Sequence, residues 1–377
     1  MNALEAQLDY PFDAVDGAIA PFVPAAGTTF EVAPGVYWLR MGLPFALNHI
    51  NLWLLDEMRD EACEEKRKEK RGDLQAASHE HPPGWTAVDC GIADDATRAA
   101  WQNVFAARLD GRPISRVLAT HCHPDHVGLA DWLCQRWQAP LWMSAGEYAF
   151  ARMMSAGLPG VDGTAMLPHF AQHGLTDPQM LAQLGVRKSY YPTLVPAVPH
   201  SYVRLQDGQT VRIGPYAWRV ITGFGHSPEH VALYCAERNL LISGDMVLPR
   251  ISTNVSVFAI EPLANPVQQY LDSLDKFADL PADVLVLPSH GRPFRGLHTR
   301  IDQLNTHHAE RLAEVAAACT TARSAADIVP IMFRRELDGH QLSFALGEAL
   351  AHLHKLWFDG VLQRLPEHDG VVRFKVY

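Results

Sequence analysis

The most informative segment of the chain reads Thr120-His121-Cys122-His123-Pro124-Asp125-His126. It ends the short apolar run 114–120, which is typical of a buried strand that delivers polar side chains at its C-terminal end. Three imidazoles and one carboxylate lie within six residues, and the proline favours a turn in which alternate side chains converge. Single loop histidines are common, but three at this spacing beside an aspartate are not. We therefore predict a metal site at the end of this strand.

Polar residues also follow later apolar runs of the chain. His226 and His230 lie in the stretch Gly-His-Ser-Pro-Glu-His at 225–230, Asp245 follows Ser-Gly, and His290 follows Pro-Ser. Each of these groups comes after a strand-like run, so all of them can gather along one edge of a β-sandwich.

These residues together resemble the metallo-β-lactamase-fold hydrolases. The resemblance covers about residues 30–297 and implies an α/β fold, an αβ/βα four-layer sandwich. The family motif H-x-H-x-D-H and its three later ligand positions are matched, in the family's order, by His121, His123, Asp125, His126, His226, Asp245 and His290.

The resemblance implies a site for two divalent metal ions, for which we expect zinc, with iron and manganese as alternatives. One ion would be held by His121, His123 and His226, the second by Asp125, His126 and His290, and Asp245 would bridge them. Two such ions lower the pKa of a shared water enough to supply hydroxide at neutral pH, which attacks a carbonyl carbon or a phosphorus.

We expect three residues to serve catalysis beside the metal ions. Asp125 would orient the nucleophile and carry a proton, and Asp245 would support turnover as the bridging carboxylate. His230 has no ligand position in the family pattern. It would hold a ligand or contact substrate, and a buried imidazole with a purely structural role is the alternative.

The domain organisation follows from changes in composition along the chain. We predict an N-terminal extension at 1–29, a catalytic domain at 30–297 and a winged-helix-like domain at 298–377. Within the catalytic domain, a charged insertion occupies 57–83, and a cap rich in methionine and aromatic residues occupies 144–200, where it would form an adaptable apolar lid.

The last segment predicts helices over Arg300–Ala318, Ala325–Leu337 and Phe344–Phe358, followed by a hairpin that ends in the strand Val371–Val376. It resembles the winged-helix appendage of the lactamase-beta-2-like branch of the superfamily. Members of that branch include single-strand endoribonucleases and thioesterases that act on acyl carriers. Residues 298–377 carry nine lysines and arginines against ten aspartates and glutamates, so they offer no basic face for RNA.

The overall composition and net charge limit the classes of partner that we expect. The 377 residues are 48% hydrophobic and 20% charged with a net charge of −10, which fits a globular protein and disfavours a nucleic-acid partner. Six scattered cysteines without a C-x-x-C pair, and no signal-like or membrane-spanning stretch, predict a cytoplasmic protein. We expect a small-molecule substrate and no membrane partner. For the oligomeric state, a homodimer is an alternative that the sequence leaves undecided.

The function that these observations favour is hydrolysis of an ester or thioester whose acyl part is apolar. A single-strand endoribonuclease or another phosphodiester hydrolase is one alternative, and a non-catalytic metal-binding scaffold is the other. A β-lactamase of the usual kind would place a cysteine among the ligands of the second metal ion. Glyoxalase II shares the seven ligands, but this C-terminus shows no basic cluster for a glutathione carboxylate.

Overall fold

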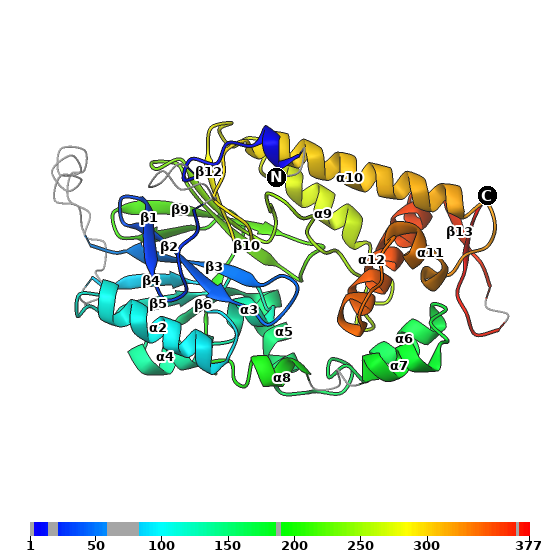
Figure 1. Ribbon diagram of the computed structural model, residues 1–377, viewed down its shortest axis with the longest axis horizontal. Coiled ribbons are helices and arrows are strands. Elements are labelled where there is room, and N and C mark those ends of the chain that lie inside the picture. The colour runs from blue at the N-terminus through cyan, green and yellow to red at the C-terminus, as the bar shows by residue number, and fades with distance from the viewer. Residues whose placement is uncertain (1–3, 14–21, 59–82, 186–189, 367–368) are drawn as a thin grey trace.

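Two β-sheets packed face to face form the centre of the protein (Figure 1). The computed structural model describes residues 4–13, 22–58, 83–185, 190–366 and 369–377. Most of the charged insertion predicted at 57–83, including His79 and His81, lies outside the described residues.

The first sheet has seven strands in sequence order, antiparallel from β1 to β4 and parallel from β4 to β7. Its strands are β1 (Thr29–Ala33), β2 (Val36–Gly42), β3 (His49–Asp56), β4 (Trp85–Val88), β5 (Ile114–Leu118), β6 (Leu141–Ser144) and β7 (Val203–Leu205). The central strands β3 and β4 are apolar on both faces, because helices cover one face and the second sheet covers the other.

The second sheet has five strands in the order β12-β11-β10-β9-β8, with only β11 and β12 parallel. They are β8 (Thr210–Ile213), β9 (Tyr216–Gly223), β10 (His230–Cys235), β11 (Leu240–Gly244) and β12 (Leu285–Pro288). Between the sheets, Trp38 and Trp53 of the first pack with Leu233 and Ile242 of the second.

Helices cover both outer faces of the sandwich. The first sheet is covered by α2 (Asp95–Arg108), α3 (Pro124–Val127) and α4 (Ala130–Trp137), and the second by α9 (Pro266–Asp275) and the C-terminal helices. A 3-10 turn, η1 (Glu5–Gln7), lies near the N-terminus. The predicted αβ/βα four-layer sandwich is therefore confirmed.

The C-terminal unit consists of α10 (Leu297–Ala318), α11 (Ala325–Met332), α12 (Gly339–Phe358) and a two-stranded antiparallel sheet of β13 (Leu362–Arg364) and β14 (Phe374–Val376). The prediction that the second helix reaches Leu337 is wrong: Pro330 lies in its last turn and Phe333 is already extended. The third helix begins at Gly339 rather than Phe344, because Asp338 and Gln341 form a capping box.

The segment predicted as an apolar cap divides between two neighbours. Its helices are α5 (Ala145–Ser155), α6 (Met166–Gln172), α7 (Pro178–Gly185) and α8 (Tyr190–Leu194). Helices α5 and α8 pack near the first sheet, whereas α6 and α7 lie below the C-terminal helices, where Phe170 and Leu184 join their core (Figure 1). Part of the apolar surface expected to line a lid is thus used in packing.

None of the helices in the described part of the chain is both long and apolar enough to cross a membrane. The five cysteines in that part are buried free thiols.

Candidate metal centre

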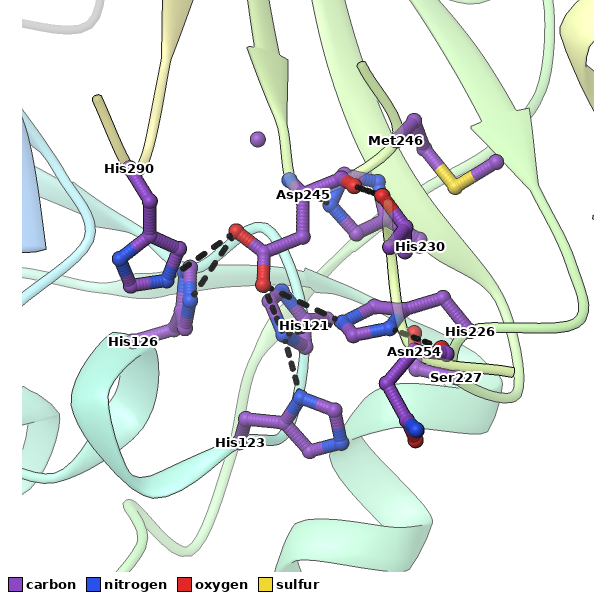
Figure 2. Close-up of polar contacts among 12 residues, drawn as sticks. His121, His123, His126, His226, Ser227, His230, Asp245, Met246, Asn254 and His290 are labelled. Atoms are coloured by element: carbon purple, nitrogen blue, oxygen red, sulfur yellow. Dashed lines mark hydrogen bonds and ion pairs between the residues drawn. The ribbon is translucent and has the colours of Figure 1, made fainter. Parts of the chain in front are cut away.

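The residues predicted as metal ligands meet at one edge of the sandwich. The loop after β5 and the first turn of α3 carry four of them, and the segments after β9, β11 and β12 each carry one. Because these strand ends lie at the same edge, segments far apart in sequence deliver side chains to one place (Figure 2).

Seven side chains form two groups, each with ligand atoms within 4.8 Å of one another. The first group is His121, His123, His226 and Asp245, and the second is Asp125, His126 and His290. The structure therefore brings together every residue that the sequence pattern proposed as a ligand.

The Asp245 carboxylate lies between the two groups (Figure 2). Its Oδ1 is 3.5 Å from His290 Nε2 and 3.6 Å from His126 Nε2. Its Oδ2 is 3.3 Å from His226 Nε2. One carboxylate oxygen of Asp245 therefore faces each group.

The donor atoms converge in a way that suits cations. Nε2 of His121 lies 2.8 Å from Nδ1 of His123 and 3.2 Å from Nε2 of His226. The buried His126 Nε2 and Asp245 Oδ1 have no hydrogen-bond partner within the described residues. Lone pairs aimed at a shared point, with nitrogen and carboxylate oxygen as the only donors, fit two borderline divalent ions.

Hydrogen bonds on the far side of three rings fix their orientation and leave each Nε2 free for a metal ion. The bonds run from Nδ1 of His126 to the Asp89 carboxylate (2.8 Å), from Nδ1 of His226 to the Asn254 carbonyl (2.8 Å) and from Nδ1 of His290 to the His49 carbonyl (2.7 Å).

The two groups differ in their protonation. Burial lowers the pKa of His123 to about 3 and that of His121 well below its ordinary value. Burial also opposes the charged form of His126, but the surrounding carboxylates, with Asp89 foremost, outweigh it and raise its pKa to about 9. His290 is raised well above its ordinary pKa by Asp245 and Asp125 in the same way. Cations entering the second group would displace these protons.

Asp89 is a site residue that sequence reasoning missed. Besides His126, its carboxylate accepts the main-chain N–H of Thr120 at 2.7 Å and the Thr120 hydroxyl at 2.9 Å. The signal available was an aspartate at the end of a buried strand, 85–88, followed by a glycine two residues later.

Glu147, in the first turn of α5, was also missed. Its carboxylate is fully buried and accepts hydrogen bonds from the Cys122 N–H (2.8 Å), the Ser227 hydroxyl (2.5 Å) and the Glu229 N–H (2.7 Å). Glu147 thereby joins the loop of His121 and His123 to the loop of His226.

His230 lies outside both ligand groups. It is fully buried, and its Nε2 accepts the main-chain N–H of Asp245 at 3.0 Å (Figure 2). The preceding Gly244 has a φ of +54°, and a Cβ there would lie 2.3 Å from His230 Nε2. These contacts fit a residue that holds the bridging carboxylate, and the predicted catalytic role of His230 stays a prediction.

Four further polar or sulfur-containing residues have structural contacts. The Asn51 amide donates to the main-chain carbonyls of Pro288 and Gly291, and Cys122 lies in the core. His308 and His352 pack against each other inside the C-terminal unit.

Comparison with known proteins agrees with this geometry. The family described as the metallo-beta-lactamase superfamily matches residues 81–290, and the metallo-beta-lactamase-like C-terminal domain matches residues 312–377. The chain is 54% identical to a beta-lactamase domain protein from Burkholderia ambifaria. The match to the crystal structure of that protein covers 100% of each of the two chains, with a TM-score of 0.87.

More distant relatives agree. A metallo-beta-lactamase family protein from Thermus thermophilus is 26% identical, with a TM-score of 0.73 over 92% of this chain and 100% of its own. The probable metallo-hydrolase YqgX of Bacillus subtilis is 26% identical over 50% of this chain and 72% of its own length. The chain belongs to the metallo-beta-lactamase superfamily and is a metallo-hydrolase.

Proposed function

We propose that this metallo-hydrolase cleaves the ester or thioester bond of a substrate with an apolar acyl part, with two zinc ions as its cofactors. The observation that carries the proposal is the pair of ligand groups with the Asp245 carboxylate between them.

The residues present would hold the two ions as the two groups divide them, with Asp245 shared. The ions, when bound, supply a hydroxide nucleophile at neutral pH and stabilise negative charge on the reacting oxygen. The protein's own part is to fix the histidine rings and to exclude water from the histidines, of which His121 and His126 are fully buried.

We infer that Asp125 moves a proton. Its side chain is 18% exposed, whereas those of the adjoining His126 and His290 are 0% and 3% exposed. Those two rings, His126 first, outweigh burial and lower the pKa of Asp125 to about 2, so it is a carboxylate at neutral pH. A partly open carboxylate can accept the proton of the nucleophile and return it to the leaving group.

The apolar character of the substrate rests on charge and on the cap. The net charge of −10 disfavours polyanions. The cap reaches the ligand loop through α8, where the Tyr191 hydroxyl donates to the carbonyl of Cys122 at 2.5 Å. This hydrogen bond ties an aromatic residue of the cap to the loop that carries His121 and His123.

The test is a substrate panel of p-nitrophenyl esters, acyl-CoA thioesters and bis-p-nitrophenyl phosphate. Each added CH₂ in the acyl chain should lower KM about fourfold, from the ~0.8 kcal/mol gained on burying it, until the cap is filled. Salt should have little effect. Cleavage of the phosphodiester or of single-stranded RNA alone, with affinity that falls by about 10³ between 50 and 200 mM salt, would reverse the assignment.

A further inference from the structure

The segment Thr253–Val257 lies against the first ligand group on one side and against the C-terminal helix α12 on the other. The Thr253 hydroxyl donates to the main-chain carbonyl of Asp245. The Asn254 carbonyl accepts Nδ1–H of His226 at 2.8 Å (Figure 2). Two ligands of the first group therefore depend on the placement of this segment.

The side chain of Asn254 is held from the other side. Its Nδ2 donates to Oε2 of Glu348 at 3.3 Å, and its Oδ1 accepts the Ser256 hydroxyl at 2.8 Å. Glu348 belongs to α12, 94 residues further along the chain. Asn254 thus connects the C-terminal unit to His226, because its side-chain amide bonds to Glu348 and its main-chain carbonyl bonds to the histidine ring.

The backbone of α12 approaches the same segment closely. The Val257 N–H donates to the carbonyl of Gly347 at 3.1 Å, and a Cβ on Gly347 would lie 2.7 Å from Cβ of Ser256. Ser256 and Val257 are buried. A side chain at position 347 would collide with Ser256, so the close contact between the segment and α12 requires glycine there.

We propose that α12 positions the first metal site, with Glu348 as a positioning residue that orients Asn254 and, through its carbonyl, the His226 ring. The proposal rests on the metal centre and not on the class of substrate. It gives the C-terminal unit a part in the metal site, in addition to its own packing.

Glu348 needs an acceptor oxygen for this role rather than a charge. Burial raises the pKa of Glu348 to about 7, although the Asn254 hydrogen bond opposes the rise. Both the acid and the carboxylate keep an oxygen that can accept from Asn254 Nδ2. A glutamine offers the same acceptor, whereas an alanine offers none.

The experiment measures Zn²⁺ binding to the full-length chain by competition with a chromophoric chelator, without substrate. Glu348→Ala should weaken one of the two zinc equivalents about tenfold, the low end of the effect of a residue that supports a ligand. Glu348→Gln should restore most of that affinity. Leu350→Ala is the matched control, because Leu350 is buried on the same helix in the core of the C-terminal unit.

The site affected is identified by combining Glu348→Ala with ligand variants. With His226→Ala, the Glu348→Ala change should cause no further loss, since the ring it orients is gone. With His126→Ala, the loss of the first-site equivalent should persist. Gly347→Ala tests the close contact between the α12 backbone and Ser256, and it should also weaken zinc binding at the first site. Alanine favours a helix more than glycine does, so such a loss would not result from weakening of α12 itself.

Wild-type affinity for both zinc equivalents in Glu348→Ala and Gly347→Ala would overturn the proposal. So would an equal loss in Leu350→Ala, or no recovery in Glu348→Gln, because either would indicate general loosening of α12. The readout needs no substrate, so it is independent of whether the protein hydrolyses esters.

Discussion

His230 accepts the main-chain N–H of Asp245 at 3.0 Å, so a fully buried imidazole fixes the backbone of the residue whose carboxylate lies between the two ligand groups. The contact explains why a histidine outside both groups lies so near the centre. If Asp245 bridges two ions, loss of His230 should disturb that carboxylate through the backbone and not through a lost ligand, which predicts a distinct mutational signature.

His230→Ala should lower kcat by about 10- to 100-fold while retaining more bound metal than Asp245→Ala, because the ligands stay and only their support is lost. Steady-state kinetics with metal analysis of the same samples measures both. His230→Gln, which can still accept the N–H, should recover part of the activity. Full activity in His230→Ala would show that the contact has no functional role.

Gly244→Ala should reproduce the His230→Ala kinetics, because a Cβ there would lie 2.3 Å from His230 Nε2 and the φ of +54° disfavours side chains. Gly42→Ala is the matched control, since a Cβ at Gly42 has no heavy atom within 4 Å. Similar kcat values in the two alanine variants would contradict this reading of Gly244.

Asp245→Ala should lose bound metal and lower kcat by orders of magnitude without unfolding the protein. Plasma emission on protein purified without chelator should give two metal equivalents for the wild type, one for each ligand group, and fewer for the variant. Circular dichroism checks the fold. Full metal content with wild-type kcat in Asp245→Ala would exclude a bridging role.

Glu147→Ala should destabilise the protein by about 1–3 kcal/mol or more, because three donors in two ligand loops lose their shared acceptor. Urea unfolding measures the change. Glu147→Gln should cost less, since one oxygen remains. The exposed Glu310→Gln is the control and should change the free energy of unfolding by less than about 0.5 kcal/mol.

The free energy of unfolding should fall as pH decreases from about 6.5 to about 3. Burial lowers the pKa of His173 and His308 to about 3 and that of His352 and His354 to about 4. In this range the unfolded chain binds protons that the folded chain cannot, so folding weakens; above it these residues are neutral in both states.

The measurement is the urea midpoint against pH in chelator, which removes the competing effect of metal. His173→Leu should reduce the slope of the free energy of unfolding against pH by up to about 1.4 kcal/mol per pH unit, which is the contribution of one bound proton. An unchanged slope would mean that His173 titrates alike in the folded and unfolded chain.

The sequence sufficed for part of the site because that part is local. The four ligands from His121 to His126 share one loop, so their spacing alone predicts a metal site. His226, Asp245 and His290 each follow a strand-like run, which lets them gather at one sheet edge, but only the order of motifs in a known family assigns them to the same site as that loop. The α/β layering followed from the run of strand-like and helical segments, which hydrophobic pattern reveals directly.

The supporting residues could not be predicted in this way. Asp89 and Glu147 are single carboxylates whose partners lie 25 to 82 residues away, and spacing along the chain carries no trace of such contacts. The same holds for Glu348. The apolar side chains of α6 were recognised as apolar, but their pattern did not specify that the C-terminal helices, and not a substrate, would cover Phe170.

The two sheets supply the ligands unequally: four come from the loop after β5 of the first sheet, and three follow strands of the second. During synthesis the first four leave the ribosome long before His290. A chain interrupted before β12 would hold an incomplete second group, unable to retain its ion. Both ligand groups are therefore complete only once synthesis has passed His290, and the first sheet alone cannot form either of them.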